Sequence, residues 1–329
     1  MTPDAIERFV AESTAGTVTS PAHVAVIRAL VTRALSLAQY ESNLGDLQSA
    51  VTALEELLEG SRLFQPWHDT PKATVFGSAR TTPDSVLYEM ATALSAALTT
   101  QGWLTVTGAG PGIMEASSKG AGRDNLIGVN IELPFEHGTN AFVDVEHRHI
   151  ATSYFFTRKV IMTRSSQAFV AFPGGVGTMD ELFEILTLLH TGKTDPVPVV
   201  LVDQPGGTFW SSWTEFMSRQ VVAEGYLSPG DEVTYVVCDD VASALSEITG
   251  FYANYVGCVT GQGEAMLDIR YAPSDEEFAR LTAAFGHLNV TVGSGARGTT
   301  VTFAFNGRSY ATLRRVINEV NTWQGQSAS

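Results

Sequence analysis

The stretch from Ala168 to Glu181 places the strongest constraint on the fold of this chain. It opens with an apolar run, 168–172, that has the length and composition of a buried strand. Pro173 and three glycines interrupt the run, and a helical stripe of apolar residues begins at Leu182. A strand, a glycine loop and a helix in this order present backbone N–H groups and the positive end of a helix to an anion. The stretch therefore predicts an anion-binding turn, and a tightly packed turn without a ligand is the open alternative.

Three polar residues follow the glycines of this stretch. Thr178 is expected to cap the predicted helix, and Asp180 and Glu181 are expected in its first turn. An acidic side chain in a first turn also complements the positive helix end. The position of Glu181 in the sequence, taken alone, is therefore explained by helix stabilisation at least as well as by a catalytic role.

Strands and helices alternate on both sides of this stretch. Apolar runs at 73–76, 103–107, 127–131, 197–202 and 235–237 read as further strands separated by helical stripes. Because the strands are nearly all apolar, we expect a mostly parallel sheet that is covered on both faces. Glycine loops follow Phe76, Thr107 and Phe172, and ligands of such sheets bind beyond the carboxyl ends of the strands. The three loops are therefore predicted to meet at one edge.

The chain divides into three predicted parts. Residues 1–68 show two helical stripes and form a helical N-terminal extension, whose second helix is expected to end at Gly60. Residues 69–252 form a Rossmann-like, doubly wound α/β domain with a mostly parallel sheet. Residues 253–329 form a small α+β appendage, in which Ser274 and Glu277 have the spacing of a capping box.

The composition of the chain argues against several classes of binding partner and of cellular location. A net charge of −15 and a pI near 4.8 argue against nucleic acid or an anionic membrane as the main partner. No apolar run is long enough to span a bilayer, and the residues after Met1 do not resemble a signal peptide. Cys238 and Cys258 form neither a disulfide framework nor a metal-binding pair. We therefore expect a cytoplasmic protein.

Common cofactor motifs are missing. Residues 108–112 read GxGxG with a proline inside, which is not the GxGxxG dinucleotide fingerprint, and no GK[ST] follows either glycine run. His147 and His149 lack a third metal ligand nearby, so we interpret them as structural. Lys159 has no further feature of a pyridoxal phosphate site around it. We expect no cofactor and no metal.

Two adjacent cations, Arg158 and Lys159, precede the predicted strand at 168–172. A solvated or ion-paired helix face is the common explanation for such a pair. The functional alternative is that Arg158 reaches the edge with the glycine loops, where its planar fork suits a phosphate, a base edge or a carboxylate.

With these residues in view, the sequence resembles the LOG family, the cytokinin-activating phosphoribohydrolases once described as lysine decarboxylases. The family motif PGGxGTxxE matches 173–181, and its Arg-Lys pair matches Arg158 and Lys159. Residues 108–115 fit its GPGIMEA variant, and 76–78 fit its first loop. The lead-in at 154–156 is similar to the longer bacterial branch. The resemblance covers roughly residues 70 to 250.

The resemblance implies a homodimer or higher homo-oligomer that hydrolyses a nucleoside 5′-monophosphate, such as AMP or a cytokinin riboside 5′-monophosphate, to free base and ribose 5-phosphate. It implies Arg158 and Glu181 as the catalytic pair. The phosphate is expected at the backbone of Gly174, Gly175, Gly177 and Thr178. The other candidates for contacts with the nucleotide are Ser78, Gly110, Gly112, Met114, Glu136, Lys159, Val176, Asp180 and Thr187.

A second class of function stays open. Proteins with this kind of fold can also bind a nucleotide-like or molybdopterin-like ligand without turnover, because a fold does not determine a function. The presence of both Arg158 and Glu181 favours the enzyme, since a carrier has no chemical need for the pair.

Overall fold

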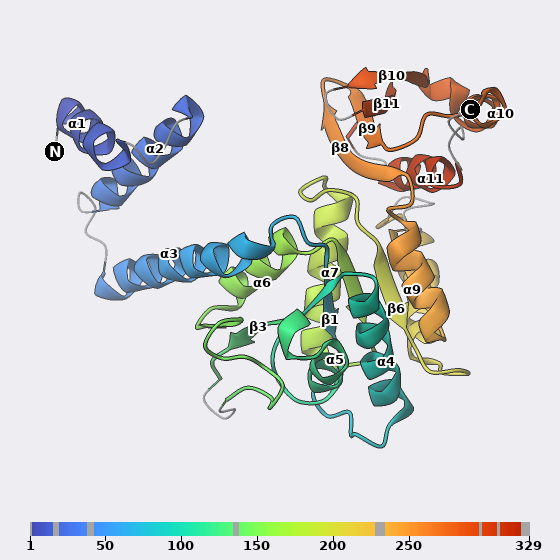
Figure 1. Cartoon of the computed structure of the whole chain (residues 1–329), viewed down its shortest axis with the longest axis horizontal. Helices are drawn as coiled ribbons and strands as arrows, with labels where there is room; N and C mark the ends of the chain where they lie inside the picture. The colour runs from blue at the N-terminus through green and yellow to red at the C-terminus, as the bar shows by residue number, and fades with distance from the viewer. Residues whose placement is uncertain are drawn as a thin grey trace. The chain divides into compact units, whose positions relative to one another are not determined.

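A computed structural model describes residues 2–15, 20–37, 43–133, 138–227, 234–295, 298–307 and 310–323 of the chain (Figure 1). Its contacts separate two compact units, Met1–Leu58 and Glu59–Ser329. No helix in these described ranges is both long enough and apolar enough to cross a membrane.

The first unit is helical, as predicted. It contains α1 (Pro3–Thr14), which buries Ile6 and Val10, and α2 (Pro21–Leu37). The helix α3 (Leu44–Phe64) begins in this unit and ends in the second one. The prediction that this helix ends at Gly60 is wrong, because Gly60 lies inside it against the side chain of Ile161. A Cβ at position 60 would meet that side chain at 2.7 Å, so glycine allows the close packing.

The second unit is built on a seven-stranded parallel sheet, which confirms the predicted α/β class. Its order is β4-β3-β2-β1-β5-β6-β7. The chain adds β2, β3 and β4 on one side of β1 and then returns to place β5 on the other side. The order therefore reverses between β1 and β5, where open α/β sheets bind ligands. The strands are β1 (Lys72–Phe76), β2 (Leu104–Thr107), β3 (Leu126–Ile131), β4 (His149–Thr152), β5 (Ala168–Ala171), β6 (Val199–Val202) and β7 (Val236–Cys238).

Helices cover both faces of the sheet. Neighbouring residues of β5 point to opposite faces: Phe169 joins a core with Leu182 and Trp210, whereas Val170 joins a core with Leu94 and Ile248. The helices are α4 (Val86–Thr100), α5 (Ile113–Ala121), α6 (Phe155–Ser165), α7 (Val176–His190), α8 (Phe209–Phe216) and α9 (Val241–Gly250). A π-helical segment, Met217–Val222, continues α8.

The C-terminal part forms its own antiparallel sheet, drawn in orange to red in Figure 1, with the order β10-β11-β9-β8. Its inward residues, such as Leu267 and Phe303, belong to the same core as Phe169 of the parallel sheet. Ser274 and Glu277 form the predicted capping box. The elements are β8 (Tyr255–Gly261), β9 (Glu264–Ile269), α10 (Asp275–Phe285), β10 (Thr291–Gly295), β11 (Gly298–Ala304) and α11 (Tyr310–Val320).

The C-terminal part and the segment between α9 and β8 that leads into it contact the amino end of the parallel strands. Tyr252 donates a hydrogen bond from its hydroxyl to the carbonyl of Gln167, at 2.7 Å, just before β5. The hydroxyl of Tyr310 accepts a hydrogen bond from the backbone N–H of Val197, at 3.3 Å, just before β6. The carboxyl edge of the sheet therefore stays clear of these contacts. The domain boundaries at 68 and 252 remain predictions.

Candidate active site

The three glycine loops meet at the carboxyl edge of the sheet, as predicted. The backbone N–H of Ser78, after β1, donates to the carbonyl of Pro173, after β5, at 3.1 Å. The N–H of Ile113, at the start of α5, donates to the carbonyl of Ser78 at 3.1 Å. Gly112 precedes Ile113 with φ +69°, and a Cβ there would collide with the backbone of Ser78 and Ala79. Backbone contacts therefore join the loops on both sides of the reversal point.

The helix α7 begins earlier than predicted. Its N-cap is Gly175 and its first residue is Val176, so the expectation that Thr178 caps it is wrong. The Thr178 side chain is buried and packs against Gly174 instead. Asp180 and Glu181 consequently lie beyond the first turn of the helix.

The start of α7 is open to a ligand. In the structure no side chain caps this helix, and Val176 is 87% exposed. Any Cβ added at Gly175 or Gly177 would meet open space. The backbone N–H groups of a first turn have no partner within their own helix, so they are suited to an anion such as a phosphate.

Arg158 extends from the first turn of α6 towards the same edge. Its Nε donates to the carbonyl of Val129, in β3, at 3.1 Å, and its guanidinium lies against Gly108 of the second glycine loop. Burial lowers the pKa of Arg158, while the charges of Glu181 and Asp180 act in the opposite direction. Among the described residues no ion pair joins Arg158 and Glu181 directly, although each influences the charge of the other.

Lys159 points to α7. Its Nζ lies 2.9 Å from Oδ2 of Asp180, 3.0 Å from Oε2 of Glu184 and 3.5 Å from Oε2 of Glu181. The side chain is 8% exposed. Burial acts to lower the pKa of Lys159, but the hydrogen bond to Asp180 and the two glutamate charges outweigh it, so the pKa is raised.

Glu181 is the buried carboxylate of the site, with 14% of its side chain exposed. Burial raises the pKa of Glu181 above its ordinary value, and Arg158 and Lys159 limit the rise. A carboxylate whose proton affinity is increased, near a helix end that is suited to an anion, is a suitable general base or cation stabiliser.

Three further predicted site residues are Met114, Thr187 and Glu136. The Met114 side chain lies beside both Gly108 and Gly110, where an added Cβ would meet its terminal atoms at 2.8 Å. Thr187 is exposed on α7 and donates to the carbonyl of Phe183. Glu136 lies outside the described residues.

Sequence reasoning missed Glu184 as a third carboxylate around Lys159. Its spacing of four residues from Asp180 is a signal that could have found it, because residues four apart share one helix face. The described residues contain no cluster of three side chains that could hold a metal ion. His149, one of the two histidines considered for a metal, packs its ring against Gly128 instead.

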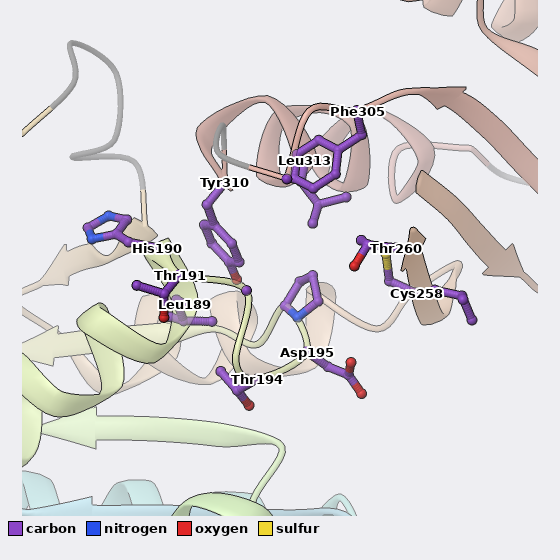
Figure 2. A pocket seen from close by; sticks show the side chains of 14 residues that line it. Leu189, His190, Thr191, Thr194, Asp195, Cys258, Thr260, Phe305, Tyr310 and Leu313 are labelled. Atoms are coloured by element: carbon purple, nitrogen blue, oxygen red, sulfur yellow. The ribbon is translucent and has the colours of Figure 1, made fainter. Parts of the chain in front are cut away.

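Two cavities lie at the opposite, amino end of the sheet. One of about 430 Å³ separates the end of α7 from the C-terminal part and is lined by Leu189, Tyr310 and Leu313 among others (Figure 2). The other, of about 790 Å³, includes Trp103 and Tyr252 in its lining. Neither is lined by Arg158, Glu181 or the glycine loops, so the candidate site rests on its chemistry and not on cavity size.

Part of this chain is similar to known proteins. A family model described as "Possible lysine decarboxylase" matches residues 100–248. The cytokinin riboside 5′-monophosphate phosphoribohydrolase of Mycobacterium tuberculosis is 33% identical over 165 residues, which cover 48% of this chain and 83% of that protein. The enzyme of the same name from Mycobacterium marinum is 31% identical over 178 residues, covering 53% of this chain and 90% of that protein.

A solved structure of the molybdenum cofactor carrier protein from Chlamydomonas reinhardtii is 26% identical, covers 55% of this chain and 96% of its own, and has a TM-score of 0.39. The two mycobacterial relatives are matched over most of their length. The segment 100–248 contains the second and third glycine loops, the Arg-Lys pair and Glu181. The chain therefore belongs to the LOG family, the family of the cytokinin riboside 5′-monophosphate phosphoribohydrolases.

Proposed function

We propose that the protein hydrolyses the N-glycosidic bond of a nucleoside 5′-monophosphate and releases the free base and ribose 5-phosphate. The observation that carries the proposal is the buried Glu181 carboxylate beside Arg158, one and a half turns along the helix whose open N-terminus follows the glycine loop. The substrates we expect are AMP and cytokinin riboside 5′-monophosphates, in keeping with the names of the relatives.

The 5′-phosphate binds at the start of α7 in this proposal. The exposed backbone at Gly175, Val176 and Gly177 supplies N–H donors, and the helix end supplies a positive potential. A phosphate held at this point places the attached ribose near Glu181. Binding energy from the phosphate then positions the sugar for reaction.

Glu181 acts on the sugar. Cleavage of an N-glycosidic bond passes through a state in which the ribose carries positive charge, as in glycoside hydrolysis. The ionised Glu181 carboxylate stabilises that charge and takes a proton from the attacking water. The water oxygen bonds to C1′, the electron pair of the C1′–N bond leaves with the base, and the base takes up a proton. Arg158 favours the ionised form of Glu181 by its charge.

The proposal extends to assembly and location. We expect subunits to associate as a homodimer or higher oligomer, and we expect the protein in the cytoplasm. Both follow from the family resemblance and from composition, and both await measurement.

The test is incubation of the purified protein with a panel of nucleoside 5′-monophosphates, with free base followed by chromatography. Adenosine serves as the substrate control, because it lacks the phosphate that α7 is expected to hold. Glu181→Gln is the test variant, and Glu215→Gln on the exposed face of α8 is its matched control. Base release from AMP or a related nucleotide, lost only in Glu181→Gln, would support the hydrolase. Tight binding without any release would refute it and leave a carrier.

A further inference from the structure

We propose that Lys159 is a positioning residue that binds no substrate and holds the carboxylates of Asp180, Glu181 and Glu184. Asp180 and Glu184 compete with Glu181 for the Lys159 ammonium group, and so they determine how much of the Lys159 charge acts on Glu181. This inference rests on the proposed function only in taking Glu181 as the catalytic carboxylate. It concerns the interface between α6 and α7, behind the open start of α7.

The hydrogen-bond donors of Lys159 are fully used within the protein. An ammonium group has three N–H donors and no acceptor. Oδ2 of Asp180 at 2.9 Å, Oε2 of Glu184 at 3.0 Å and the carbonyl of Asp180 at 3.2 Å are within hydrogen-bond distance of Nζ. With 8% of the side chain exposed, no donor remains for a phosphate or a ribose.

Glu181 is the most distant of the three carboxylates. Its Oε2 lies 3.5 Å from Nζ, so it is held mainly by charge, whereas Asp180 and Glu184 have the short contacts. Asp180 and Glu184 are also more exposed, with 54% and 35% of their side chains accessible against 14% for Glu181. Water therefore solvates the two outer carboxylates, and Glu181 depends on protein charges.

The spacing along α7 explains why a cation is needed here. Residues 180 and 184 are four apart and residues 181 and 184 are three apart, so the three negative charges share one helix face. Like charges at these spacings repel each other. The charged groups that act on Glu181 are Arg158 and Lys159 from α6 and Asp180 from α7 itself, and Glu184 acts through Lys159.

Two substitutions consequently have opposite effects on Glu181. Lys159→Met removes a positive charge beside it, so its carboxylate holds a proton to higher pH. Glu184→Gln removes a competitor for the ammonium, so more of the Lys159 charge acts on Glu181, and its carboxylate ionises at lower pH. A charge at this distance typically displaces a titration by about one pH unit or more. Lys159→Arg keeps the charge and should restore most of the wild-type behaviour.

The experiment measures the titration of Glu181 directly, by NMR of the protein labelled with ¹³C at the glutamate carboxyl carbons. The Glu181→Gln spectrum assigns the signal, and circular dichroism confirms folding of each variant. We expect the Glu181 midpoint to rise in Lys159→Met and to fall in Glu184→Gln. Unchanged midpoints, or shifts in the same direction, would overturn the proposal. If Lys159→Met does not fold, the Glu184→Gln shift decides.

Kinetics provides the second measurement, with AMP as the probe. The acidic limb of the kcat/KM profile reports groups of the free enzyme and should follow the NMR midpoints in both variants. KM should change less than about threefold, as expected for a residue without substrate contact. A large rise in KM with an unmoved acidic limb would show that Lys159 binds the substrate, against the proposal. If wild type releases no base at all, the proposed function fails, whereas the NMR titration still tests the role of Lys159.

Discussion

Replacement of Gly112 by alanine tests whether contact between the glycine loops builds the site. Gly112 has φ +69° and ψ −127°, a conformation that costs a residue with a Cβ about 1–3 kcal/mol. The new Cβ would also approach the Cα of Ala79 at 2.8 Å and collide with the carbonyl of Ser78. Both of these atoms belong to the backbone and cannot rotate away, so the loops must separate to admit the Cβ. Overpacking of this kind lowers the free energy of unfolding by about 1–3 kcal/mol.

Gly102→Ala is the matched control. Gly102 also has a positive φ, +78°, but an added Cβ there has no atom within 4 Å. This variant therefore has the dihedral cost without the collision, about 1–2 kcal/mol before any gain from a less flexible unfolded chain. We expect Gly112→Ala to be less stable than Gly102→Ala by about 2 kcal/mol, which corresponds to a melting midpoint roughly 5 °C lower.

The assay combines thermal melts with kcat/KM for AMP. Displacement of the Ser78 backbone disturbs its hydrogen bond to Pro173 and hence the entry to α7. Because small displacements of positioned groups reduce rates strongly, we expect kcat/KM to fall about tenfold or more in Gly112→Ala and to stay near wild type in Gly102→Ala. Equal midpoints and equal activities in the two variants would refute the reasoning.

Two further predictions concern charge. In Glu181→Gln, the melting midpoint should exceed that of wild type at pH 8, because burial raises the folded-state pKa of Glu181 and the stability that its protonated form contributes is lost as pH rises through that pKa. The difference should vanish below about pH 4, under the ordinary glutamate pKa of about 4.3, and a lower midpoint at pH 8 would contradict the sign. In Arg314→Met, loss of the buried guanidinium that pairs with Glu247 and lies 4.6 Å from the Phe251 ring centre should cost about 3 kcal/mol in urea unfolding. Arg219→Met, at an exposed ion pair with Glu215, is its control and should cost under about 1 kcal/mol.

Local patterns were sufficient for most of the parallel sheet and its glycine loops. Apolar runs near β1, β2, β3, β5, β6 and β7 and the stripes between them follow from neighbours in the sequence, which is why the alternation of strands and helices and the covered faces could be predicted. The order of the strands within the sheet depends on tertiary pairing. The strand β4 was missed because His149 and Ala151 within it are not buried, so it lacks the continuous apolar run of the other strands. It is recognisable only by its parallel pairing with β3.

Helix boundaries were less predictable because tertiary contacts decide them. Gly60 continues α3 since Ile161, far along the chain, packs where a side chain would be. Thr178 packs against Gly174, so Gly175 and not Thr178 is the N-cap of α7. In both cases the residue type indicated an end or a cap, and packing between distant segments overrode it.

The sequence by itself determined that a strand, a glycine loop and a helix carry Glu181, and that an Arg-Lys pair precedes them. Only the tertiary structure decided what each residue does there. Arg158 and Lys159 are adjacent, but successive residues of a helix point about 100° apart. Arg158 therefore reaches Val129 and the second glycine loop, whereas Lys159 reaches the carboxylates of α7. The charge state of Glu181 depends on burial and on cations more than twenty residues away in sequence, and neither is encoded in its local pattern.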